Sequence, residues 1–137
     1  MTEIARDVVI VGAGAVGLTA ANALRMSGLS VAVLEAGDRI GDESDEQVHL
    51  LAERLGEDVL LSHPVQSVHW SVAPRVAAIS GGLTVRARFA ILAQGSADSI
   101  AFVPLLPHVG QGSPVHFATS DDMARSAAST IVETIRS

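Results

Sequence analysis

The sequence contains no cysteine and no lysine. Without cysteine, the chain has neither disulfides nor thiolate ligands for a metal. All nine basic residues are arginines, and 15 acidic residues give a formal net charge of −6. This balance provides no basic stripe for nucleic acid and no positive run for a membrane surface. We therefore expect neither nucleic acid nor a membrane among the partners of this chain.

Aromatic residues and long apolar runs are also scarce. The chain has three Phe, one Trp and no Tyr, so its core must be built from Val, Leu, Ile and Ala. The apolar stretch after Asp7 is interrupted by glycines and lacks a basic leader, which is typical of a buried strand and not of a signal peptide or a membrane span. A chain of 137 residues is long enough for one compact domain. We expect a single domain over residues 1–137 in a soluble, cytoplasmic protein.

A glycine-rich turn separates a predicted strand from a predicted helix. Val8–Val11 is a run of β-branched residues, as in a buried parallel strand. Gly12, Gly14 and Gly17 then form the pattern G-x-G-x-x-G. The first glycine permits a tight turn, the second lets the backbone approach a pyrophosphate, and the third lets the helix press against the sheet. Because the start of a helix also attracts phosphate, the turn predicts a dinucleotide site.

The segment after this turn completes a strand–helix–strand unit. Leu18–Ser27 predicts the helix, and Gly28 stands where a helix end favours a left-handed residue. Val31–Val33 predicts a second strand, which ends in Glu35. A carboxylate there, about twenty residues beyond the glycines, can accept hydrogen bonds from ribose hydroxyls. Glu35 also argues against NADP, because a 2′-phosphate would meet a like charge.

The rest of the chain predicts more strands than helices. Helical spacing occurs in residues 47–55, and a last helix begins with a cap at Ser120 or Asp121 and ends near Arg136. A loop rich in Pro and Gly fills residues 96–114. Further parallel strands are predicted at residues 58–61, 90–93 and 115–117, and an antiparallel meander at residues 65–70, 72–78 and 83–89, with a tight turn at residues 80–82. We therefore expect an α/β fold with an open, doubly wound, Rossmann-like parallel sheet of order 3-2-1-4-5 and a three-stranded antiparallel β-meander.

The block Asp7–Gly41 resembles the N-terminal FAD fingerprint of the glutathione-reductase-type flavoproteins. Within it, the segment Leu34-Glu-Ala-Gly-Asp-Arg-Ile-Gly41 is most similar to the flavin-containing amine oxidases, and Ala21 and Gly28 match the extended FAD pattern. Segments in the second half of the chain resemble the same family, so the resemblance covers most of the sequence. It implies FAD as the cofactor, and a chain without cysteine would hold it without a thioether bond.

The resemblance also implies roles for individual residues. The glycine turn would carry the pyrophosphate, Glu35 the ribose and Val65 the adenine region. Asp121, with Asp122 beside it, would lie against the ribitol, and the helix start near Met123 would face the flavin pyrimidine. The cofactor-binding candidates are Gly12, Gly14, Ala15, Val16, Gly17, Glu35, Ala36, Gly37, Val65, Ala93, Gly95, Asp121, Asp122 and Met123.

The sequence departs from the amine oxidase family at several positions. Asp42 and Glu43 stand where the family has a glycine and a pyrophosphate-binding arginine, so charge neutralisation would rest on the helix dipole or on Arg39. A chain without Lys or Tyr can form neither the lysine near the flavin nor the aromatic amine cage of the family. The large substrate-binding insertions are absent. We therefore assign no catalytic residue and no metal site, and expect an engineered or minimised cofactor domain whose partly exposed flavin supports at most weak, non-specific redox activity.

Two other functions fit the same motifs. An NAD-binding dehydrogenase fragment would also use Glu35, although the meander and the C-terminal acid favour FAD. A cofactor subunit that needs a separate substrate-binding chain is the third hypothesis. An apolar patch in the loop 96–114 would then mediate self-association, or else act as a lid over the core. The residues of this patch are Ile100, Phe102, Val103, Leu105 and Leu106.

Overall fold

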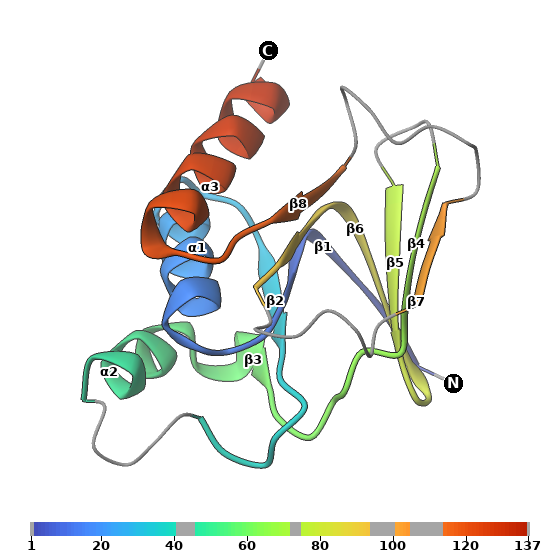
Figure 1. Cartoon of the computed structure of the whole chain (residues 1–137), viewed down its shortest axis with the longest axis horizontal. Helices are drawn as coiled ribbons and strands as arrows, with labels where there is room; N and C mark the ends of the chain where they lie inside the picture. The colour runs from blue at the N-terminus through green and yellow to red at the C-terminus, as the bar shows by residue number, and fades with distance from the viewer. Residues whose placement is uncertain (1, 41–45, 72–74, 94–100, 105–113, 137) are drawn as a thin grey trace.

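The computed structural model describes residues 2–40, 46–71, 75–93, 101–104 and 114–136. Figure 1 shows helices gathered on one side of a bent sheet. The elements are, in order, β1 (Thr2–Val11), α1 (Ala15–Met26), β2 (Val31–Leu34), α2 (Glu46–Leu55), a 3₁₀ turn η1 (Gly56–Asp58), β3 (Val59–Leu60), β4 (Ser67–Ser71), β5 (Arg75–Ser80), β6 (Leu83–Leu92), β7 (Ala101–Pro104), β8 (Val115–Phe117) and α3 (Asp121–Arg136).

The described strands form one eight-stranded sheet. β3, β2, β1, β6 and β8 are successive parallel neighbours, which confirms the predicted order 3-2-1-4-5. β6 also pairs antiparallel with β5, and β5 pairs antiparallel with β4, which confirms the predicted meander. The fold is therefore the Rossmann-like α/β class that the sequence predicts.

Strand β6 is shared between the two parts of the sheet. Residues 83–87 pair with β5, residues 90–92 pair with β8, and β1 pairs along both segments. The prediction of separate strands at 83–89 and 90–93 is therefore wrong, because one continuous strand serves both. β1 also begins at Thr2 and not at Val8, since its first residues pair with the first half of β6.

The predicted loop 96–114 contains a strand. β7 pairs in parallel with β4 at the end of the strand order, so the loop prediction is wrong for residues 101–104. Ile100, Leu105 and Leu106 lie outside the described residues. Self-association through this segment therefore stays a prediction.

The central strands separate two apolar cores. One core packs α1, α2 and α3 against side chains such as Val8 and Ile10. The other core lies on the opposite face, where Val9 and Val11 meet residues of β4 and β5. Val8–Val11 is completely buried, because successive side chains of a strand point to opposite faces and both faces are covered. Each fully buried valine contributes roughly 1.5–3 kcal/mol of transfer free energy.

Helix α1 ends as its sequence predicts. Gly28 has a φ of 88°, in the left-handed region that glycine adopts without strain. Its N–H donates to the Arg25 carbonyl at 2.9 Å, and the Leu29 N–H donates to the Leu24 carbonyl at 3.1 Å. This pair of hydrogen bonds is a Schellman motif, which satisfies carbonyls at the end of the helix. None of the described helices is long and apolar enough to cross a membrane.

Candidate functional site

The glycine turn joins the end of β1 to the start of α1. Gly12 has a φ of 107°, and its N–H donates to the Leu34 carbonyl at 2.8 Å, which ties the turn to the end of β2. A Cβ atom at Gly17 would lie 1.9 Å from the Gly12 carbonyl oxygen. The backbone of α1 therefore touches the turn so closely that no side chain fits at Gly17.

The second glycine faces open space. Gly14 is the N-cap of α1, it is exposed, and a Cβ atom there would have no neighbour within 4 Å. No side chain caps the helix, and its first turn has no acidic residue. The first N–H groups of a helix have no acceptor within the helix. Gly14, Ala15 and the half-buried Val16 therefore present an uncapped, electropositive helix start.

The Glu35 carboxylate accepts hydrogen bonds from two backbone N–H groups, one in this turn and one in the loop after β2. Its Oε1 accepts a hydrogen bond from the Ala13 N–H at 2.9 Å, and its Oε2 accepts one from the Gly37 N–H at 2.9 Å. The carboxylate therefore links the glycine turn to the loop after β2. Hydrogen bonds to a charged carboxylate are stronger than those between neutral groups, so Glu35 holds the turn in place.

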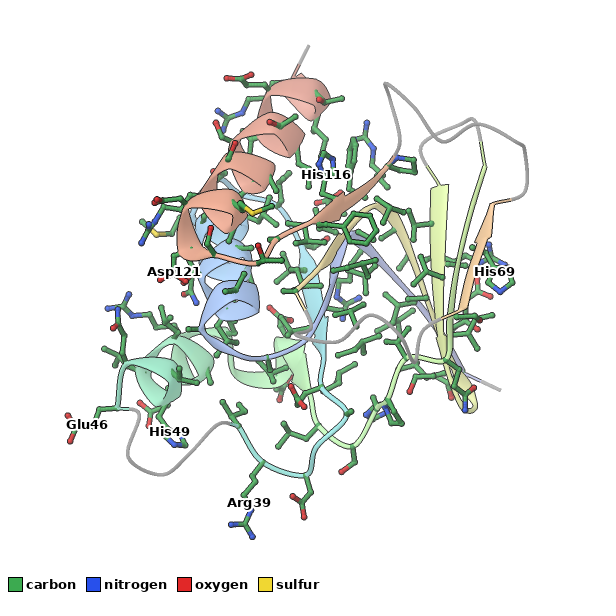
Figure 2. The ribbon with its side chains drawn as sticks, in the orientation of Figure 1. Arg39, Glu46, His49, His69, His116 and Asp121 are labelled. Carbon is green, nitrogen blue, oxygen red and sulfur yellow. The ribbon has the colours of Figure 1, made fainter. Side chains whose placement is uncertain are left out.

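The loop after β2 carries the other candidates of this region. Ala36 and Gly37 are exposed. Arg39 projects outward from the loop, as Figure 2 shows, and it pairs with Asp38 at an Nε–Oδ1 distance of 3.8 Å. The Arg39 side chain is 76% exposed, and within the described part of the chain no hydrogen bond or ion pair joins it to the glycine turn.

The crossover from β3 to β4 lies against the same loop. The Ser62 N–H donates to the Gly37 carbonyl at 2.8 Å, and the His63 N–H donates to the Glu35 carbonyl at 2.8 Å. Two residues later, the Val65 side chain is buried in the second core. These hydrogen bonds bring the segment before Val65 next to Glu35, as an adenosine site shared by both would require.

The strands next to the turn fix its position. The Ala93 N–H donates to the Val11 carbonyl at 2.9 Å, so Ala93 lies beside the end of β1. The Ala118 N–H donates to the Leu92 carbonyl at 3.0 Å. Gly95 lies outside the described residues.

The start of α3 carries the C-terminal candidates. Asp121, Asp122 and Met123 are all exposed, and Figure 2 places Asp121 at the first turn of α3. Ser120 caps the helix, because its Oγ accepts from the Met123 N–H at 3.2 Å. The Met123 amide is therefore engaged, and the predicted alternative of an Asp121 cap is wrong. Asp122 pairs with Arg125 at 3.6 Å, whereas the Asp121 carboxylate has no such partner among the described residues.

β8 leads to α3 and carries His116. The His116 ring lies 6.1 Å from that of Phe89 between centroids, at an angle of 49°. Burial lowers the pKa of His116 from its ordinary value of 6.5. The imidazole is therefore held neutral where it packs beside Phe89.

Sequence reasoning missed the backbone partners of Glu35 and the contacts that position the crossover. The Ala13 and Gly37 N–H groups and the carbonyls that receive the Ser62 and His63 N–H groups have no sequence signature, since every residue carries such groups. Ser62 in the crossover has a positive φ of 57°. A serine in the sequence does not predict that conformation, because non-glycine residues adopt it rarely.

Comparison with known proteins agrees with this geometry. Residues 10–79 match the family described as "NAD(P)-binding Rossmann-like domain". Putrescine oxidase from Kocuria rosea is 62% identical over 40 residues, which are 29% of this chain and 8% of that protein. The flavin-containing amine oxidase resemblance predicted from the sequence is therefore confirmed.

Solved structures show the same fold. A redesigned variant of putrescine oxidase superposes with a TM-score of 0.67 and 18% identity, covering 80% of this chain and 62% of that chain. A steroid monooxygenase bound to NADP gives a TM-score of 0.58 and 23% identity, covering 65% of this chain and 26% of that chain. The chain thus spans less than two thirds of these proteins. It belongs to the family of NAD(P)-binding Rossmann-like domains.

Proposed function

We propose that residues 1–137 form a single FAD-binding domain that holds the cofactor without a covalent bond and leaves the isoalloxazine partly exposed. One observation carries the proposal: an uncapped helix start and the Glu35 carboxylate converge on the glycine turn. The two groups complement the diphosphate and the ribose of a dinucleotide. The similarity to putrescine oxidase favours FAD among the dinucleotides.

The phosphate end of the proposed site is built from backbone. The open space at Gly14 lets a phosphate oxygen approach the N–H groups of Gly14, Ala15 and Val16. Gly12 and Gly17 shape the turn without contacting the cofactor through a side chain. With Arg39 projecting outward, the helix dipole of α1 supplies the positive potential for the diphosphate.

The ribose end depends on Glu35. Each carboxylate oxygen accepts one backbone N–H and keeps a further lone pair for a ribose hydroxyl. The backbone bonds orient both oxygens before the cofactor arrives. Ala36, Gly37 and the Val65 backbone would then enclose the adenosine.

The flavin end would lie between Ala93, Gly95 and the start of α3. Asp121 is free to accept from the ribitol hydroxyls, with Asp122 beside it. Because Ser120 engages the Met123 N–H, the amides of Asp121 and Asp122 are the ones offered to the pyrimidine edge. Bound FAD would supply electron-transfer chemistry, and we assign no catalytic side chain to it. At most, slow and non-specific electron transfer would follow.

The test is a titration of the purified chain with FAD, followed by flavin fluorescence and visible absorption. We expect saturable binding, with FMN bound at least about tenfold more weakly because FMN lacks the adenosine that Glu35 recognises. Glu35→Gln should weaken FAD binding about tenfold or more, since a charged hydrogen-bond acceptor is lost. Glu53→Gln, which changes an exposed acid on α2, is the matched control and should leave the affinity unchanged. Equal affinity for FMN and FAD, or normal binding by Glu35→Gln, contradicts the proposal.

NAD binding is the second candidate, favoured by the family match. A competition experiment separates the two. If NADH displaces FAD at lower concentration than FAD displaces NADH, the chain is a nicotinamide-nucleotide module. Sizing the chain with and without FAD tests the third hypothesis, because a subunit that lacks its partner should self-associate.

A further inference from the structure

A hollow of about 570 Å³ lies at the tip of the hairpin between β5 and β6. Its wall comes from the start of β1, the β3–β4 crossover and the hairpin turn. The described lining includes His63, Pro64, Gln66, Ser80, Gly81 and Gly82. A hollow of this volume falls within the range of about 300–1,000 Å³ that small-molecule sites occupy. None of the residues proposed for the dinucleotide lines it.

Ser80 gives the hollow a buried polar group without a partner. The residue is 5% exposed, and its hydroxyl makes no hydrogen bond with any residue that the structure describes. Native proteins satisfy nearly all buried polar groups, because an unmade hydrogen bond costs the full desolvation of that group. An unpartnered hydroxyl in the wall of a hollow therefore points to a ligand or to solvent held there.

His63 and Gln66 are each oriented by one hydrogen bond. The His63 Nδ1 lies 2.6 Å from the Leu61 carbonyl oxygen, so Nδ1 carries the proton and Nε2 is left as an acceptor. The Gln66 Oε1 accepts from the Gly81 N–H at 3.3 Å, which leaves the Gln66 amide NH₂ as a donor. The wall thus combines a fixed acceptor, a fixed donor and the Ser80 hydroxyl, which can do both.

The rest of the described wall is uncharged. No acidic residue, lysine or arginine stands among the described residues that line the hollow. A Cβ atom at Gly81 or Gly82 would meet nothing within 4 Å, so the peptide planes of the turn are uncovered. Pro64 and Leu83 add apolar surface. A charged ligand would find no counter-charge among the described residues of this wall.

We propose that this hollow binds a small, uncharged, planar heterocycle with a cyclic-amide edge. The ring N–H of such a molecule would donate to His63 Nε2, and its carbonyl would accept from the Gln66 amide or the Ser80 hydroxyl. The ring faces would rest on Pro64 and on the glycine turn. This pairing uses every oriented group of the wall, and it uses no residue proposed to bind the cofactor.

The experiment is a ¹H–¹⁵N NMR titration of the full chain with uracil as the probe. We expect saturable shifts of the Gln66, Gly81 and Gly82 amides. 1,3-Dimethyluracil keeps both carbonyls but carries a methyl group on each ring nitrogen, so it has no ring N–H. It should bind at least about tenfold more weakly, because the hydrogen bond to His63 Nε2 is lost. Ser80→Ala should weaken uracil binding about three- to tenfold. It should leave folding intact, because it removes an unpaired hydroxyl. Ser126→Ala on the exposed face of α3 is the control, with unchanged affinity.

Four results would overturn the proposal. The first is the absence of saturable shifts at the solubility limit of uracil. The second is equal binding of the dimethylated analogue, and the third is an unchanged affinity in Ser80→Ala. Shifts centred on Ala13 and Glu35 would also contradict it, since they would assign uracil to the cofactor site. Because FAD is absent from this titration, its outcome is separate from that of the FAD experiment.

Discussion

Two glycines of one turn have opposite surroundings. At Gly17 the added methyl group of alanine would overlap the Gly12 carbonyl, 1.9 Å away, whereas at Gly14 it would meet open space. Gly14 also has a φ of −78°, which any residue adopts. Gly17 therefore serves the packing of α1, and Gly14 serves access to the helix start.

Gly17→Ala and Gly14→Ala should consequently fail in different ways. Gly17→Ala should lower the free energy of unfolding by about 3 kcal/mol or more, because backbone has to move. Gly14→Ala should cost only about 1 kcal/mol in helix capping but should weaken FAD binding, because its methyl group occupies the space of the phosphate. Urea unfolding and FAD titration of both variants check this. A Gly17→Ala protein of normal stability would show that the turn can relax.

His116 makes stability depend on pH. Its pKa is lowered by burial, so the folded chain holds it neutral, while the unfolded chain takes up a proton near the ordinary value of 6.5. The unfolded state thus binds more protons below that pH, and stability should decrease as the pH falls from 6.5 toward the lower folded pKa. His116→Asn should remove this decrease. Urea unfolding at a series of pH values measures it, and identical pH curves for both proteins would refute the assignment.

At the scale of elements, α1 and α3 differ in how their ends are satisfied. α1 combines an uncapped start with a Schellman end, and α3 has Ser120 as its cap. A helix without an N-terminal cap is less stable, because its first N–H groups lack acceptors. The uncapped start of α1 at the glycine turn is therefore consistent with a ligand that supplies these acceptors. The start of α3 is already satisfied in part by Ser120, so the start of α1 is the better candidate for the proposed phosphate contact.

Removing the α3 cap should have a defined cost. Ser120→Ala leaves the Met123 N–H without its acceptor and should lower the free energy of unfolding by about 1 kcal/mol. Ser126→Ala in the exposed middle of the same helix should be neutral or slightly stabilising, because alanine is the better helix former. Thermal unfolding of the two variants gives the comparison. Equal melting temperatures would mean that the cap contributes nothing.

At the scale of the whole molecule, the sequence predicts what is encoded locally. Val8–Val11, the positive φ of Gly28 and the parallel strand order follow from residue type and spacing. The candidate site could be predicted as far as its glycines and Glu35, because those residues carry a recognisable spacing. The two hydrogen bonds that Glu35 accepts could not be predicted, since their donors are backbone N–H groups.

Long-range pairing explains the errors. Residues 2–6 of β1 are mostly exposed or half-buried and show no strand pattern of their own, yet they pair with residues 83–87. β7 contains a proline and follows a polar segment, and only its pairing with β4 makes it a strand. Such ladders depend on partners about 30 to 80 positions away, which propensity over a short window does not include.

The shared strand β6 has a consequence for how the chain melts. β1 and β6 pair through both the helix-covered region and the meander. Neither region can therefore unfold without breaking hydrogen bonds between these two strands. The molecule should therefore denature in a single all-or-none step. In scanning calorimetry, the measured enthalpy should equal the van't Hoff enthalpy. A heat-capacity trace with two resolved peaks would mean that the helix-covered region and the meander unfold separately, in spite of the continuous β1–β6 pairing.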